Sequence, residues 1–174
     1  MFNRIPMLPQ RTPNRAVSSI DDRTSVAATA RVTAGAVITD QAVVGGSAVA
    51  LGAVTVADRA QLVEHGMLGG TARLQGRAVL SGWAAAIEEA VLDGDGWVVG
   101  RAVVSGRASV AGHAQVFGDA TVTAGAVVDG YAWIHGHATI TGQSWVSGRA
   151  QVGGHAWSAG PRASAGRCGS AGTR

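Results

Sequence analysis

Two of the five histidines in this sequence lie close together, and histidine is the side chain best suited to proton transfer near neutral pH. His135 and His137 flank Gly136 within residues 132–138. Either imidazole could act as a general base that removes a proton from a reacting hydroxyl or amine. The pair is therefore the candidate catalytic site of the chain.

A second set of polar and aromatic residues recurs in constant steps of 18 along the numbering. Its members are His65, Trp83, Arg101, Asp119, His137 and His155. Asp119, His137 and His155 offer carboxylate oxygen and imidazole nitrogen, which zinc accepts as ligands, so these three are the candidate metal ligands. Solvated turns also accept polar side chains freely, and we favour no metal site at these positions.

The elements that position these residues are short repeats, which are clearest between residues 100 and 142. This segment repeats one six-residue pattern seven times, with Gly at a corner, then Ala, then an aliphatic residue two places after the Ala. Between residues 26 and 152, Val, Ile or Leu fills 20 of 22 aliphatic positions. Between residues 30 and 156, Ala fills 18 of 22 small-residue positions, and no insertion breaks the count.

A period of six is typical of extended chain with regular corners. In a helix, every sixth side chain is rotated by roughly 240°, which gives no single buried stripe. In a strand, the Ala and the aliphatic residue two places later lie on one face, and the Gly that follows permits a tight corner. Strands this short cannot bury an inner face alone, so the repeats must stack as a parallel β-helix.

Several positions between residues 54 and 96 depart from the pattern. Ala86 stands at an aliphatic position, Gly66 and Gly96 stand at Ala positions, and Glu64 and Glu88 stand at corners. Solenoids accept imperfect repeats, so we expect tolerated drift or a slightly deformed coil there.

The repeat resembles that of the bacterial hexapeptide-repeat proteins, in which a small residue follows an aliphatic one by four places. Val104 with Ala108, Val110 with Ala114, and Ile134 with Ala138 match this pattern. The Gly-x-Ala-x-Val pattern is most similar to that of uncharacterised proteins of this family that are named as acetyltransferases. The resemblance covers about residues 24 to 160. One departure is that Gly usually comes one place later than in the family.

This resemblance implies an all-β fold, namely a single-stranded, left-handed, three-sided β-helix of about seven coils, each made of three six-residue repeats. It also implies a homotrimer that transfers an acyl group from acetyl-CoA or another acyl-CoA to a small-molecule acceptor. In related enzymes a corner histidine is the general base. Its position corresponds here to Gly136, with His135 and His137 on either side.

Outward positions of the predicted strands bring apolar residues together on one flat face. The expected oligomer face consists of Val63, Val79, Trp97, Val99, Phe117 and Trp133. Exposed apolar patches usually contact a partner. They suit the seam of a trimeric enzyme and also suit the alternative function, a non-catalytic scaffold or polymer-forming protein that assembles through this face or through its ends.

Composition separates the repeat domain, residues 24–160, from a disordered or capping tail at 1–23 and a disordered Gly/Ala/Ser/Arg tail at 161–174. The domain carries seven arginines and nine acidic residues, a net charge of −2, so the basic excess lies in the tails and does not favour nucleic-acid binding. The sequence has no long apolar run, which predicts a cytoplasmic protein without membrane contact. Its one cysteine, Cys168, excludes an internal disulfide.

Overall fold

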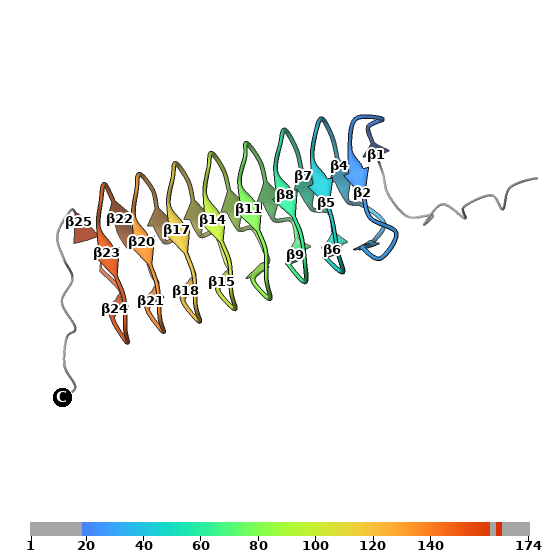
Figure 1. Cartoon of the computed structure of the whole chain (residues 1–174). Helices are drawn as coiled ribbons and strands as arrows, with labels where there is room; N and C mark the ends of the chain where they lie inside the picture. The colour runs from blue at the N-terminus through green and yellow to red at the C-terminus, as the bar shows by residue number, and fades with distance from the viewer. Residues whose placement is uncertain (1–18, 161–162, 165–174) are drawn as a thin grey trace, which may run out of the picture.

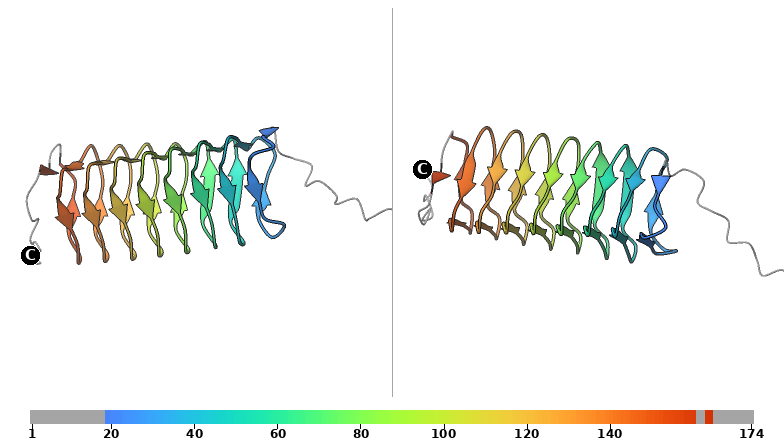
Figure 2. Two further views of the ribbon diagram at one scale, coloured as in Figure 1. Left: turned by 45° about the horizontal axis from the view of Figure 1, so that its top comes forward. Right: turned by 90° about the horizontal axis from the view of Figure 1, so that it is seen from above.

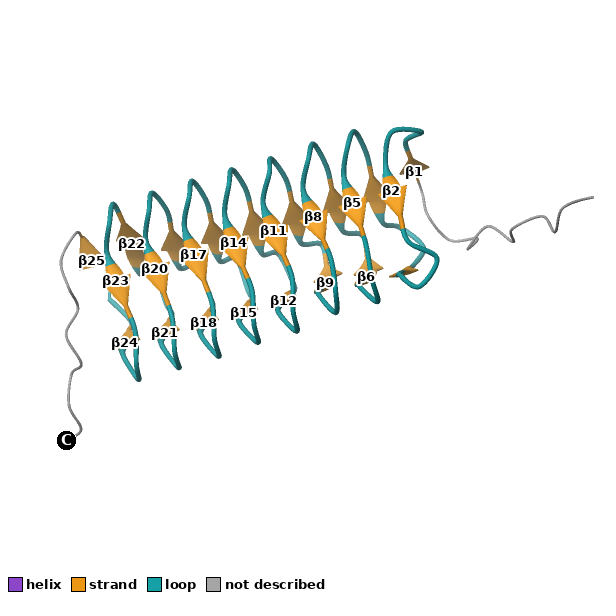
Figure 3. Ribbon diagram, viewed as in Figure 1, coloured by secondary structure: helices purple, strands orange, loops and turns teal. Residues whose placement is uncertain are grey.

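The described residues of the chain, 19–160 and 163–164 of a computed structural model, wind into a β-solenoid of about seven coils (Figure 1). Three parallel sheets form its sides, and no described residue is helical (Figure 3). Both views in Figure 2 show the coils stacked along one straight axis, with the first and last coils at opposite ends. The all-β solenoid predicted from the six-residue pattern is confirmed.

The nine strands of sheet A are β1 (Ser19–Ile20), β4 (Val37–Ile38), β7 (Thr55–Val56), β10 (Arg73–Leu74), β13 (Val91–Leu92), β16 (Ser109–Val110), β19 (Val127–Val128), β22 (Trp145–Ser147) and β25 (Ala163–Ser164). The eight strands of sheet B are β2 (Ser25–Val26), β5 (Val43–Val44), β8 (Gln61–Leu62), β11 (Val79–Leu80), β14 (Trp97–Val98), β17 (Gln115–Val116), β20 (Trp133–Ile134) and β23 (Gln151–Val152). The eight strands of sheet C are β3 (Arg31–Val32), β6 (Val49–Gly52), β9 (Met67–Gly70), β12 (Ala85–Ala86), β15 (Val103–Val104), β18 (Thr121–Val122), β21 (Thr139–Ile140) and β24 (Trp157–Ser158).

Neighbouring coils pair in an almost constant register, with partners roughly 18 residues apart. In sheet B, for example, Val79 pairs with Trp97, which pairs with Gln115. This is the coil length implied by the resemblance. The left-handed sense of winding rests on the resemblance and stays a prediction. Strand β1 precedes residue 24 and β25 follows residue 160, while most of the two expected tails lies outside the described residues.

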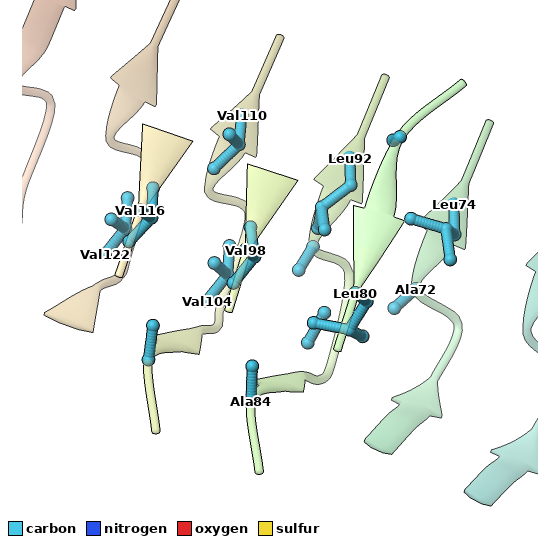
Figure 4. Packing of buried hydrophobic residues seen from close by; sticks show 14 of the residues in the cluster. Ala72, Leu74, Leu80, Ala84, Leu92, Val98, Val104, Val110, Val116 and Val122 are labelled. Carbon is cyan, nitrogen blue, oxygen red and sulfur yellow. The ribbon is translucent and has the colours of Figure 1, made fainter. Parts of the chain in front are cut away.

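The core is a narrow column of inward-facing alanine and aliphatic side chains (Figure 4). Ala78 and Leu80 are fully buried, whereas Val79 between them faces outward and is half-buried. This alternation is what a strand imposes, because successive side chains point to opposite faces. The same pattern repeats from coil to coil, so every outward position belongs to a column that runs along the axis.

The departures from the pattern compensate one another inside the core. In sheet C, Leu68 pairs with Ala50 on one side and Ala86 on the other, and all three are fully buried. A Cβ on Gly66 would lie 3.0 Å from Cδ1 of Leu62 and 2.8 Å from the carbonyl oxygen of Leu80. Large residues therefore fill the room left by small neighbours, and the register between β6 and β9 is unchanged.

From residue 35 to residue 154, each corner places one residue at positive φ, directly beneath the corner of the next coil. A Cβ on Gly76, whose φ is +69°, would lie 2.7 Å from the carbonyl oxygen of Gly94. Gly154 has the matching φ of +67°, but a Cβ there would have nothing within 4 Å, because no described corner follows it along the axis. The two glycines share the same backbone strain and differ in steric contact.

Gly154→Ala is expected to cost about 1–2 kcal/mol, the strain of a left-handed alanine. Gly76→Ala is expected to cost a further 1–3 kcal/mol or so, because the methyl group also presses on the next coil. Thermal or urea denaturation of the two variants measures the difference. Equal losses of stability would show that contact between corners is unimportant.

Candidate functional site

We call the outward side of sheet B face B. It consists of two adjacent columns of residues. The first column contains Ser25, Val43, Gln61, Val79, Trp97, Gln115, Trp133 and Gln151. The second contains Ala27, Gly45, Val63, Ser81, Val99, Phe117, His135 and Gly153. Neither column contains Asp, Glu, Lys or Arg. By contrast, the outward positions of sheet A include Arg73, Asp93 and Asp129.

Aromatic residues of face B contact one another. Trp97 is 52% exposed and Trp133 is 43% exposed, and the register places Gln115 between them. The ring of Phe117 meets Trp133 edge-on, with centroids 6.3 Å apart, and stacks on His135 at 5.5 Å. All six residues expected at the oligomer face lie in these two columns. The structure thus places them on one surface.

The imidazole of His135 lies over Gly153 of the next coil. A Cβ built on Gly153 would overlap Cε1 of His135, so the imidazole occupies the space that a side chain at position 153 would need. Phe117 packs against it from the preceding coil. The ring is consequently half-buried. The glycine that makes this possible gave no signal in the sequence, because the pattern places no restriction on that position.

We call the turn between sheets B and C corner BC. It carries the column of residues that begins at His65, and His65 stacks on Trp83 with centroids 4.1 Å apart. Further along, Arg101 Nε lies 3.5 Å from Asp119 Oδ1, and His137 Nδ1 lies 3.9 Å from Asp119 Oδ2. His137 therefore lies at the edge of face B, whereas His135 lies on it, and the two imidazoles contact different partners.

The column at corner BC is poorly arranged to bind a metal ion. The rings of His137 and His155 stack with centroids 5.0 Å apart and planes within 4° of parallel. Ring nitrogens donate in the plane of the ring, so two parallel stacked imidazoles do not direct their lone pairs to one ion. Within residues 19–160 and 163–164, no three His, Cys, Asp or Glu side chains form a group that could hold a metal.

The turn between sheets A and B, corner AB, carries a more ordered polar column that the sequence analysis missed. Arg77 donates two hydrogen bonds to Asp95, from Nε at 2.5 Å and from a terminal nitrogen at 2.7 Å. Asp95 Oδ2 lies 3.3 Å from His113 Nδ1, and the ring of His113 stacks on Tyr131 at 4.7 Å. These residues also recur in steps of 18, so writing the sequence in rows of that length would have found them.

The hydrogen bond from Arg77 lowers the pKa of Asp95, and the charges of Arg77 and His113 act in the same direction. Because the folded-state pKa lies below the unfolded value, the pair stabilises the fold at pH values above the ordinary aspartate pKa. That contribution is lost as the pH falls through the folded-state pKa. Arg77 is exposed and Asp95 is only half-buried, so the effect on stability is small.

Open depressions lie at corners of the solenoid. One at the turn between sheets C and A is lined by Glu88, Glu89, Gly106, Arg107, Ala124, Gly125, Gly142 and Gln143. Another at corner AB is lined by Arg23, Asp40, Gln41, Asp58, Arg59, Gly76 and Arg77. Neither includes His135 or His137. A single chain therefore does not enclose these histidines in either depression.

Fold and surface together define the class of protein. It is a parallel β-solenoid whose coils are built from six-residue repeats, with one uncharged aromatic face between two polar corners. No described helix is long and apolar enough to cross a membrane. The chain matches no family model, no curated protein and no solved structure.

Proposed function

We propose that this protein is a self-assembling β-solenoid and that face B contacts further copies of the chain. The observation that carries the proposal is the absence of charge from both columns of face B, combined with partly exposed Trp97 and Trp133. Interface centres are depleted in charged residues and enriched in aromatic ones, and Trp is among the residues enriched at energetic hot spots.

The size of face B bears on how tightly the copies associate. Seven rungs at about 4.8 Å and a width of about 15 Å give a flat area of roughly 500 Å². A standard stable interface buries about 800 Å² on each partner. Contacts through face B alone are therefore weak, and the assembly depends on protein concentration. A homotrimer, the stoichiometry implied by the resemblance, is the oligomer that we propose.

Light scattering over a range of concentrations tests the proposal directly. The wild-type chain should approach three times the monomer mass of 17.4 kDa as concentration rises, and the variant in which Trp97 and Trp133 are both serine should not. A wild-type mass that stays at 17.4 kDa at all concentrations would refute assembly.

A second candidate function is acyl transfer at the seam between copies. It is favoured by the positions of the two histidines, since His135 lies on face B and His137 lies at its edge, next to Asp119. An assembly through face B would bring both imidazoles to the boundary between subunits. One of them would take the proton from the hydroxyl or amine of a small acceptor, which attacks the thioester carbonyl of acetyl-CoA or another acyl-CoA and expels the CoA thiolate.

Ligand binding separates the enzyme from the scaffold. If the chain binds acetyl-CoA, millimolar ligand should raise the melting temperature in a saturable manner, because a ligand that binds only the folded state stabilises it. Replacing His135 and His137 together by alanine should then abolish acyl transfer while leaving the thermal shift in place. No shift with either coenzyme A or acetyl-CoA favours the scaffold, and full activity of the double variant removes both histidines from the site.

A further inference from the structure

The two ends of the solenoid differ from its middle in what they leave uncovered. Ile20 stands at an inward aliphatic position of the first coil and is 48% exposed, whereas the equivalent residue one coil later, Ile38, is fully buried. Val26 in the same first coil is also partly exposed. The first coil therefore presents an apolar cross-section along the axis.

In the last coil, two backbone donors have no acceptor among the described residues. Trp133 N–H and Thr139 N–H each donate to a carbonyl of the next coil, at Ala150 and Ala156, both at 2.8 Å. Their equivalents one coil later, Gln151 and Trp157, donate to no carbonyl among the described residues. Unpaired strand edges of this kind are templates for pairing with another chain.

Strand β25 covers one of the three edges at this end, and it does so out of register. Val146 pairs with Ala163, whereas the register of the preceding coils would pair it with Ser164, one position further along the chain. A slip of one residue reverses which side of the strand faces the core, so β25 ends the repeat and does not continue it. Strands β23 and β24 have no such cover among the described residues (Figure 1).

The first coil of a second copy matches the surface of the last coil. If the register of the solenoid continued across the junction, β1 would pair with β22, β2 with β23 and β3 with β24. Ile20 would then cover Val146, and Val26 would cover Val152. Arg31 would lie over Trp157, a residue 69% exposed, which is a favourable cation–π arrangement.

The strand that this arrangement must displace is β25. Ile20 of the second copy would pair with Val146, which is the position that the backbone of Ala163 now holds. We infer that β25 is a removable cap, and that the surface it guards binds the first coil of a second copy of this chain. Joined end to end, copies form a continuous solenoid. This contact is independent of face B.

Removal of the cap tests the inference. A chain that ends at Gly160 is expected to form end-to-end filaments one solenoid wide, seen by electron microscopy and as a sedimentation coefficient that rises with concentration. The full-length Ala163→Pro variant, in which β25 loses a backbone donor without truncation, should assemble in the same way. Circular dichroism confirms that each variant keeps its β-structure.

Two further variants of the shortened chain identify the contact. Ile20→Arg should abolish the filaments, because it places a charge on the apolar end of the first coil. Replacing Trp97 and Trp133 by serine should leave the filaments intact, since face B lies along the side of the stack. Filaments lost only with the Trp variant would assign the contact to face B and overturn the inference. The inference would also be overturned if the shortened chain and the Ala163→Pro variant assembled no further than the wild type.

Discussion

Replacing Trp97 and Trp133 together by serine is expected to convert the assembled protein to monomers. The two indoles project from face B two coils apart, with exposed fractions of 52% and 43% in the single chain. A hot-spot tryptophan contributes about 2 kcal/mol or more to association, so losing two should weaken binding by about a thousandfold. Light scattering at matched concentrations measures the change.

Trp145→Ser is the matched control for this experiment. Trp145 is 47% exposed and lies on sheet A, where its indole N–H donates to Asp129 at 3.1 Å. It removes one indole, about as exposed as either indole of face B, from a face that carries charge, so the mass of the assembly should not change. Equal dissociation by the control and the double variant would mean that face B is not the contact. Neither change removes a core residue, and circular dichroism should therefore be unaltered.

Leu68→Ala is expected to destabilise the fold more than any similar change in the repeat. Leu68 is fully buried between Ala50 and Ala86, so alanine there would leave three small residues stacked in succession. Leu→Ala in a core costs about 2–5 kcal/mol, and the loss grows with the cavity that remains. We expect the upper half of this range, which for a domain of this size lowers the melting temperature by about 10 °C.

The control for Leu68→Ala is Val122→Ala in the same sheet. Val122 is also fully buried, but its neighbours Val104 and Ile140 are large enough to limit the cavity. Its loss of stability should therefore be clearly smaller. In a rescue experiment, Leu68→Val combined with Ala86→Val places valine at positions 68, 86 and 104 in succession and should keep much of the stability that Leu68→Ala loses. If Leu68→Ala costs no more than Val122→Ala, the packing of large against small residues does not matter.

Much of the candidate site followed from numbering alone. Once the coil length is known, residues that differ by one coil must lie one above the other, so Trp97, Gln115 and Trp133 were certain to share a column. The column at corner BC followed in the same way, and its members are neighbours in the structure. The ordered column at corner AB was equally accessible from the same numbering.

Contacts between side chains could not be obtained from numbering. His135 and His137 are two residues apart, yet one packs on Phe117 and the other stacks on His155. Their directions depend on whether a residue stands on a strand or at a corner. The space over Gly153 that accepts His135 exists because of the neighbouring coil, which the local sequence does not describe.

The order of residues was enough to predict the repeat, the strand positions, the inward column of alanine and aliphatic residues, and hence the solenoid. Each coil needs only a short pattern that is satisfied locally, and stacking then follows from burial of the inner face. How the exceptions fit became visible only in the folded chain. Glu64 and Glu88 take φ values of 60° and 65° at corners, which a residue-by-residue preference for glycine does not predict. Leu68 fills the room beside two alanines, and β25 slips by one residue. Both features depend on the side chains and backbone of the neighbouring coil, which lie roughly 18 residues away in the sequence.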